Sequence, residues 1–158
     1  MKKSILEGKQ ILAVDDDPVF LEHLERKILE AGLKCRFDKV RTYIEAVEMM
    51  VSLTYDLVLI DIMDARSLDL LNLVVIRNFP VAVLASNPLN PDVLKRSVEI
   101  GAVSYFPKDK LREIVPFLED TLYKYLPRWK RFSERIKGNF RLTFRQDSDA
   151  RVGYSFQE

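Results

Sequence analysis

Short runs of apolar residues alternate along this chain with longer segments in which apolar residues recur every three or four positions. The short runs predict five strands, at residues 10–14, 34–40, 57–60, 81–84 and 103–106. The second is the weakest, because only Cys35, Phe37 and Val40 in it are apolar. The others are nearly continuous, which is typical of strands buried on both faces of a parallel sheet. The helical segments predict five helices, at about residues 18–31, 42–53, 68–77, 91–100 and 110–125.

Several predicted helices have residues that mark their ends. Asp17 followed by Pro18 is typical of an N-cap and a first helical position, and Gly32 ends the same helix. Asn90 and Gly101 bracket the fourth helix in the same way. The second helix is expected to pack through an apolar face made of Ile44, Val47, Met50 and Val51. Five strands alternating with five helices predict an α/β fold with a doubly wound parallel sheet, because parallel neighbours need crossover connections.

The carboxyl ends of the predicted strands carry the residues that could perform chemistry. In a doubly wound sheet, ligands bind in the crevice at these ends. Asp15 and Asp16 follow the first strand, Asp61 closes the third, and Lys108 follows the fifth. We therefore expect three carboxylates and one ammonium group to meet at one edge of the sheet.

Such a meeting of charges suits one kind of reaction. Three crowded carboxylates repel one another unless a cation or raised pKa values relieve them. Oxygen ligands with room left for water suit Mg²⁺, and Lys108 would add a mobile point charge for a phosphoryl oxygen. A metal ion and a lysine around one carboxylate indicate phosphoryl transfer, in which the protein mainly positions groups and neutralises charge.

Three sequence blocks together resemble the signature blocks of bacterial two-component receiver domains. They are ILAVDDDP at residues 11–18, YDLVLIDIM at 55–63 and GAVSYFPK at 101–108. Each block alone is a weak signal, but their order and spacing together are specific. The resemblance covers residues 10 to 122 and implies the flavodoxin-like receiver fold, with five parallel strands in the order 2-1-3-4-5.

The resemblance also implies a role for each residue at the sheet edge. Asp61 would accept a phosphoryl group from the phosphohistidine of a sensor histidine kinase or phosphotransfer protein. Asp16 and Asp61 would bind Mg²⁺ directly, Asp15 through water, and the backbone carbonyl of Met63 would complete the protein ligands. Lys108 would hold a phosphoryl oxygen.

The sequence departs from the family where phosphorylation is coupled to movement. The family has Thr or Ser at the end of the fourth strand, and Ala85 stands there without a hydroxyl. Ser86 is adjacent, but successive strand residues point to opposite faces, so it replaces that hydroxyl only if the strand end is bulged or turned. The resemblance implies that Tyr105 is the aromatic that turns inward on activation, but Ala85 lacks the hydroxyl that usually couples phosphorylation to this movement. The stretch after Asp61 is also short, which predicts a shortened third helix.

The charge of the chain is uneven, although its net charge is only +1. Residues 122–158 carry nine basic and four acidic side chains. We divide the chain into a lead-in (1–9), a receiver domain (10–122) and a basic, aromatic C-terminal extension (123–158). The extension is either a partner-binding or nucleic-acid-binding output element, or a continued last helix with a β-hairpin that packs on the receiver or on a second copy. We favour the second interpretation and do not expect nucleic-acid binding, because about 35 residues without a helix-turn-helix are few for that role.

Composition excludes several other classes. No apolar run is long enough to cross a membrane, which indicates a cytoplasmic protein without a membrane partner. The single Cys35 fits a reducing compartment, and with only one histidine a zinc site or a Cys–His pair is not expected. The five glycines form no phosphate-binding loop.

Three hypotheses for function follow. The leading one is a phospho-accepting signalling switch, which is no enzyme beyond its own phosphorylation and dephosphorylation. The first alternative is a degenerate receiver that binds partners without being phosphorylated. The second is a haloacid-dehalogenase-like phosphatase, whose Asp-x-Asp pattern Asp15 and Asp17 match superficially, although Pro18 and Val19 depart from it and the chain lacks a cap domain. A homodimer through the fourth and fifth helices is a family expectation only.

Overall fold

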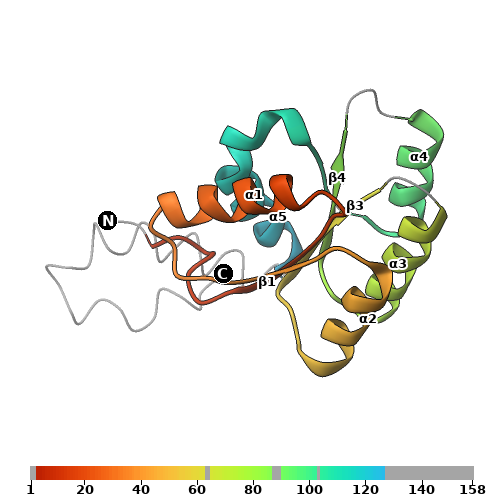
Figure 1. Cartoon of the computed structure of the whole chain (residues 1–158), viewed down its shortest axis with the longest axis horizontal. Helices are drawn as coiled ribbons and strands as arrows, with labels where there is room; N and C mark the ends of the chain where they lie inside the picture. Colours follow the sequence, from red (N-terminus) through yellow and green to blue (C-terminus); the bar gives the residue numbers. More distant parts are fainter. Residues whose placement is uncertain (1–2, 63–64, 87–89, 103, 127–158) are drawn as a thin grey trace, which may run out of the picture.

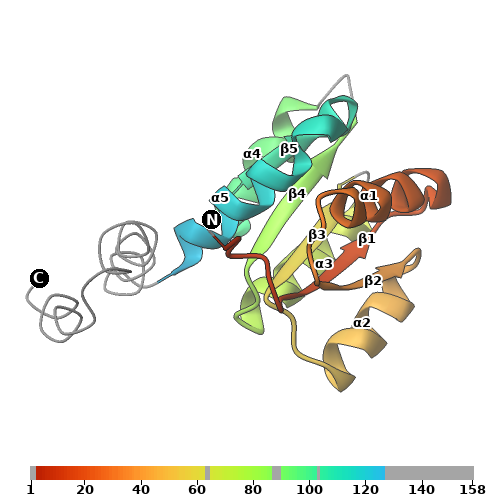
Figure 2. The same ribbon diagram turned by 90° about the vertical axis from the view of Figure 1, so that its left-hand side faces the viewer.

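The computed structural model of the chain describes residues 3–62, 65–86, 90–102 and 104–126. It contains a sheet in which all pairs of neighbouring strands are parallel, in the order β2-β1-β3-β4-β5. Figure 1 labels the three central strands, and Figure 2 labels all five. The strands are β1 (Gln10–Val14), β2 (Arg36–Val40), β3 (Leu57–Asp61), β4 (Val81–Ala85) and β5 (Ser104–Pro107). The predicted fold class and strand order are confirmed.

Helices cover both faces of this sheet. They are α1 (Pro18–Glu30), α2 (Tyr43–Ser52), α3 (Ala65–Ile76), α4 (Pro91–Ile100), the 3₁₀ helix η1 (Lys108–Glu113) and α5 (Ile114–Tyr125). Figure 2 shows α1 and α5 on one face, and α2 and α3 on the other. The predicted shortening of the third helix is wrong, because α3 has 12 residues and begins at Ala65, before the predicted start at Leu68.

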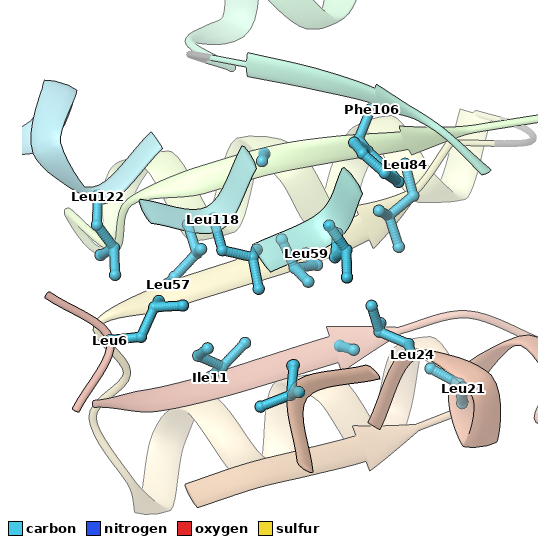
Figure 3. Close-up of a cluster of buried hydrophobic side chains, with 14 of the residues drawn as sticks. Leu6, Ile11, Leu21, Leu24, Leu57, Leu59, Leu84, Phe106, Leu118 and Leu122 are labelled. Atoms are coloured by element: carbon cyan, nitrogen blue, oxygen red, sulfur yellow. The ribbon is translucent and has the colours of Figure 1, made fainter. Parts of the chain in front are cut away.

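Two buried clusters hold the layers together, one on each face of the sheet. Ile11 and Ala13 of β1 point to the cluster under α1 and α5, whereas Leu12 and Val14 point to the cluster under α2 and α3. Figure 3 shows the first cluster, in which Leu21 and Leu24 of α1 and Leu118 and Leu122 of α5 lie over the sheet. Burial on both faces explains why β1, β3 and β4 are apolar almost throughout.

Local sequence signals set most of the helix starts. The Asp17 side chain accepts hydrogen bonds from the backbone N–H groups of Val19 and Phe20, and this caps α1 as predicted. Thr42 caps α2 by accepting from Glu45 N, while the Glu45 carboxylate accepts from Thr42 Oγ1. These bonds satisfy backbone donors that have no partner inside the helix.

The predicted apolar face of α2 is partly wrong. Ile44 and Val51 are 61% and 66% exposed, whereas Ala46 and Met50 are buried. Ala46 and Met50 lie one turn apart on the same face, and Val47 packs beside them. The helix therefore packs against the sheet through a small residue and a flexible one, and two β-branched side chains point to solvent.

The lead-in packs against the domain, and α5 is the last helix that the structure describes. In the lead-in, Leu6 is fully buried in the core and Ser4 Oγ donates to the Glu119 carboxylate of α5 at 2.6 Å. At the other end α5 continues to Tyr125, and the predicted helix and hairpin beyond it lie outside the described residues. No helix among the described residues is long and apolar enough to span a membrane.

Candidate functional site

The three predicted carboxylates meet at the carboxyl edge of the sheet. Asp15 and Asp16 follow β1, Asp61 is the last residue of β3, and β1 and β3 are neighbours in the sheet. One carboxylate oxygen from each of the three lies within 4.8 Å of the others. Their convergence follows from the parallel pairing, which aligns Val14 with Ile60 and so brings both strand ends to the same level.

Lys108 reaches this acidic cluster from the end of β5. Its Nζ lies 2.6 Å from Asp15 Oδ2 and 3.3 Å from Asp61 Oδ2, so one ammonium group bridges two carboxylates. Nζ also lies 4.6 Å from the centre of the Phe20 ring of α1, a cation–π contact. The structure therefore brings Asp15, Asp16, Asp61 and Lys108 into one site, as the sequence predicts.

Two of the three carboxylates are buried with incomplete hydrogen bonding. Asp15 is 2% exposed and Asp61 6% exposed, while Asp16 is exposed at the rim. Asp15 Oδ1 accepts from Asp17 N at 2.9 Å, but within the described part of the chain Asp61 Oδ1 has no hydrogen-bond partner. A buried carboxylate oxygen without a donor is costly and suits a cation. This oxygen-only set fits a hard divalent ion.

Burial and charge shift the pKa values in the cluster. Burial, and secondarily the neighbouring Asp15 charge, raises the pKa of Asp61 to about 6 despite the nearby Lys108. Burial also raises the pKa of Asp15, against the bond to Lys108. For Lys108, burial opposes the charged form, but the contacts with Asp15 and Asp61 prevail and raise its pKa. At neutral pH a charged lysine therefore faces the Asp61 carboxylate, which is held ionised at a free-energy cost.

A pocket of about 200 Å³ opens beside the cluster, on the face covered by α2 and α3. Its lining includes all three aspartates and five residues from the starts of these two helices: Arg41, Thr42, Tyr43, Arg66 and Ser67. Sequence reasoning gave no role to Arg41, although it directly follows β2 and so stands at the same sheet edge. Its position directly after a strand was the only feature of the sequence that could have pointed to Arg41. This feature is weak evidence, because the order of apolar and polar residues does not show how close two neighbouring loops come.

The predicted switch residues do not line this pocket. Ala85 ends β4 and is buried, Ser86 is exposed, and Tyr105 of β5 is 40% exposed. Met63, whose carbonyl was predicted as a ligand, lies outside the described residues. The roles assigned to these four residues stay predictions.

The phosphatase alternative loses its second carboxylate. Asp17 Oδ1 accepts hydrogen bonds from Val19 N and Phe20 N, so the second acid of the Asp-x-Asp pattern caps α1. It is also absent from the residues that line the pocket. The Asp-x-Asp pattern therefore does not bring two acids into the pocket.

The chain is similar in structure to known proteins, although its sequence matches no family model. No family model and no curated protein matches the sequence. Among solved structures, the chain is similar to a response regulator from Thermotoga maritima, with a TM-score of 0.65 and 21% identity over 73% of this chain and 98% of that one. It is also similar to the signal receiver domain of a signal transduction histidine kinase from Syntrophus aciditrophicus (TM-score 0.62, 25% identity, 77% and 94% covered). A third is the Mn²⁺-bound form of response regulator Rcp1 (TM-score 0.61, 19% identity, 72% and 96% covered).

Proposed function

We propose, on the premise that this chain has the fold of response-regulator receiver domains, that it is a phospho-accepting signalling switch with Asp61 as the acceptor. One observation carries the proposal: a buried carboxylate at the tip of β3 contacts Lys108 and shares a pocket with two further acids. A buried carboxylate whose charge is incompletely compensated supports a role in a reaction rather than in the stability of the fold.

In phosphoryl transfer to Asp61 the protein would mainly position the reacting groups and neutralise charge. A carboxylate oxygen of Asp61 would attack the phosphorus of the donor, forming an O–P bond while the bond to the leaving nitrogen or oxygen breaks. The leaving group takes the bonding electron pair. The attack needs ionised Asp61, which a pKa of about 6 provides at neutral pH. Lys108 would neutralise charge that develops on the phosphoryl oxygens.

A divalent cation fits the same site. Asp16 and Asp61 would bind it directly and Asp15 through water, with the Met63 carbonyl as a further ligand. When bound, Mg²⁺ would supply charge neutralisation of the three carboxylates and of the incoming phosphoryl group. The Mn²⁺-bound form of Rcp1 supports a metal in this fold. The roles of all four residues are part of the proposal.

The phosphoryl group would come from a sensor histidine kinase or a phosphotransfer protein, and the chain would work in the cytoplasm, where such donors act.

The coupling of phosphorylation to an output depends on the end of β4. Ala85 contributes only a methyl group at the end of β4. Coupling through a hydroxyl at that position is therefore lost, and a phosphorylation-independent receiver is the second candidate function.

The test is acceptance of a phosphoryl group from acetyl phosphate in the presence of Mg²⁺. We expect the intact mass of the chain to rise by one phosphoryl group, and Asp61→Asn to abolish the increase. Asp56→Asn is a matched control, because Asp56 lies at the opposite end of β3 and binds Gln10 N. An unmodified wild type, or equal labelling of Asp61→Asn, would favour the phosphorylation-independent alternative.

A further inference from the structure

Two arginines give the pocket a cationic side, which we call the arginine wall (Arg41 and Arg66). Both line the pocket that contains Asp61. Arg41 comes from the loop after β2 and Arg66 from the first turn of α3. Two separate elements therefore bring positive charge to the same cavity as the acceptor carboxylate.

Each arginine is held in place by a contact that leaves most of its donors free for other partners. Arg41 Nε donates to the backbone carbonyl of Asp16 at 3.3 Å. The Arg66 guanidinium lies 5.1 Å from the centre of the Tyr43 ring, also at the pocket. A guanidinium has five N–H donors, and one bond or one stacked face uses few of them.

Neither arginine has a carboxylate partner in the part of the chain that the structure describes. The ion pairs there involve Lys27, Arg36, Lys39, Lys108 and Lys124. The two arginines form no ion pair there although three carboxylates line the same pocket. One of these, Asp61, has an oxygen without a hydrogen-bond donor among the described residues. The acids and the arginine wall line the same pocket, whose volume of about 200 Å³ can hold a phosphoryl group.

Lys108 approaches the acids from a different side. Its Nζ lies over the Phe20 ring of α1, whereas Arg66 lies over the Tyr43 ring of α2, and α1 and α2 cover opposite faces of the sheet (Figure 2). A group attached to Asp61 in the pocket would thus have the lysine on one side and the wall on the other. The last residue of β4, Ala85, carries no donor side chain.

We propose that Arg41 and Arg66 bind the phosphoryl oxygens of a small acyl phosphate donor and of the phosphorylated Asp61. The proposal rests on the proposed function of Asp61 and names two further binding residues for it. Guanidinium groups bind phosphoryl oxygens through charge-assisted, often bidentate, hydrogen bonds. In the transfer step the Asp61 oxygen bonds to phosphorus, the bond to the acyl oxygen breaks, and the carboxylate leaves with the electron pair. Both arginines keep their protons throughout.

The test measures the rate of labelling by acetyl phosphate in Mg²⁺, followed by intact mass, across a range of donor concentrations. The variants are Arg41→Gln, Arg66→Gln and the double variant. We expect each single change to lower the second-order rate constant about 10-fold and the double change more, since each removes charged hydrogen bonds. Arg26→Gln is the control, because Arg26 is an exposed arginine of α1 and does not line the pocket.

Folding and specificity are checked in the same series. Thermal unfolding of each variant shows whether a lower rate merely reflects loss of structure. Arg66→Lys keeps the charge but loses the planar fork, so we expect it to recover only part of the rate. A folded Arg66→Gln variant with the full wild-type rate would overturn the role of Arg66.

The outcomes separate the two proposals. If the wild type is labelled at Asp61 and the folded double variant is labelled at the same rate, the arginine wall has no role and the proposed function stands. If the wild type takes no phosphoryl group, the proposed function fails and this inference fails with it. A double variant that is slower while Arg26→Gln matches the wild type supports both.

Discussion

The two ends of the sheet treat their charged groups in opposite ways. At the amino end, the Tyr55 hydroxyl donates to Asp38 Oδ2 at 2.6 Å, and Arg36 Nη2 pairs with the same oxygen at 2.9 Å. Asp56 there accepts from Gln10 N. At the carboxyl end, Asp15 and Asp61 share one ammonium group, and an oxygen of Asp61 has no donor among the described residues.

The difference indicates what each end is for. Charges that are fully partnered join strands and loops and stabilise the fold. Charges that are buried and under-compensated destabilise it, and are retained where a ligand or a reaction uses them. The comparison predicts that equivalent changes at the two ends shift stability in opposite directions.

The largest such effect is expected from Asp61→Asn. The raised pKa of Asp61, about 6 against the ordinary 3.8, means that its ionised form is disfavoured in the folded protein. Removing that charge should raise the free energy of unfolding at pH 7 by about 2–3 kcal/mol, measured by urea denaturation with a chelator present. Added Mg²⁺ should then stabilise the wild type but not the variant. A less stable variant would show that the carboxylate contributes to the fold after all.

The same charge should give a pH dependence of definite sign. Because the folded protein holds the Asp61 proton more tightly than the unfolded chain, the stability contributed by this group is complete below about pH 4 and is lost as pH rises toward 6. As the pH rises from about 4 to 6, the wild type should therefore lose up to about 2–3 kcal/mol of unfolding free energy relative to Asp61→Asn. A flat difference would place the Asp61 pKa near its ordinary value.

Tyr55→Phe tests the other end and should act in the opposite direction. Burial, and then the bond to Asp38, raises the pKa of Tyr55 to about 12. Losing the hydroxyl should lower the free energy of unfolding by about 1–2 kcal/mol, while the ring keeps its edge contact with Phe79. Labelling by acetyl phosphate should not change. Tyr105→Phe, at a half-exposed position, is the matched control and should alter stability little; equal losses in both variants would contradict the assignment.

The two ends also differ in how far the sequence predicts them. Asp15, Asp16, Asp61 and Lys108 could be placed together in advance, because parallel pairing carries the end of each strand to the same edge. The arginine wall could not be predicted, since its position depends on how the loop after β2 packs against the start of α3. The exposure of Ile44 was missed for a related reason: helical periodicity gives the spacing of an apolar face but not which side of the helix meets the sheet.

The smallest expected effect concerns the balance of charge at the carboxyl end. Because the arginine wall lines the same pocket as the acids, it repels a divalent cation there as well as attracting a phosphoryl group. The double variant Arg41→Gln, Arg66→Gln should therefore bind Mn²⁺ about 3-fold to 10-fold more tightly, with Arg26→Gln unchanged, as titration calorimetry would show. The gain should shrink in high salt, because screening acts on the exposed part of the pocket. Weaker Mn²⁺ binding in Arg41→Gln alone would have a different cause. In the wild type Arg41 Nε donates to the Asp16 carbonyl, and such a result would mean that this bond orients Asp16 for the metal.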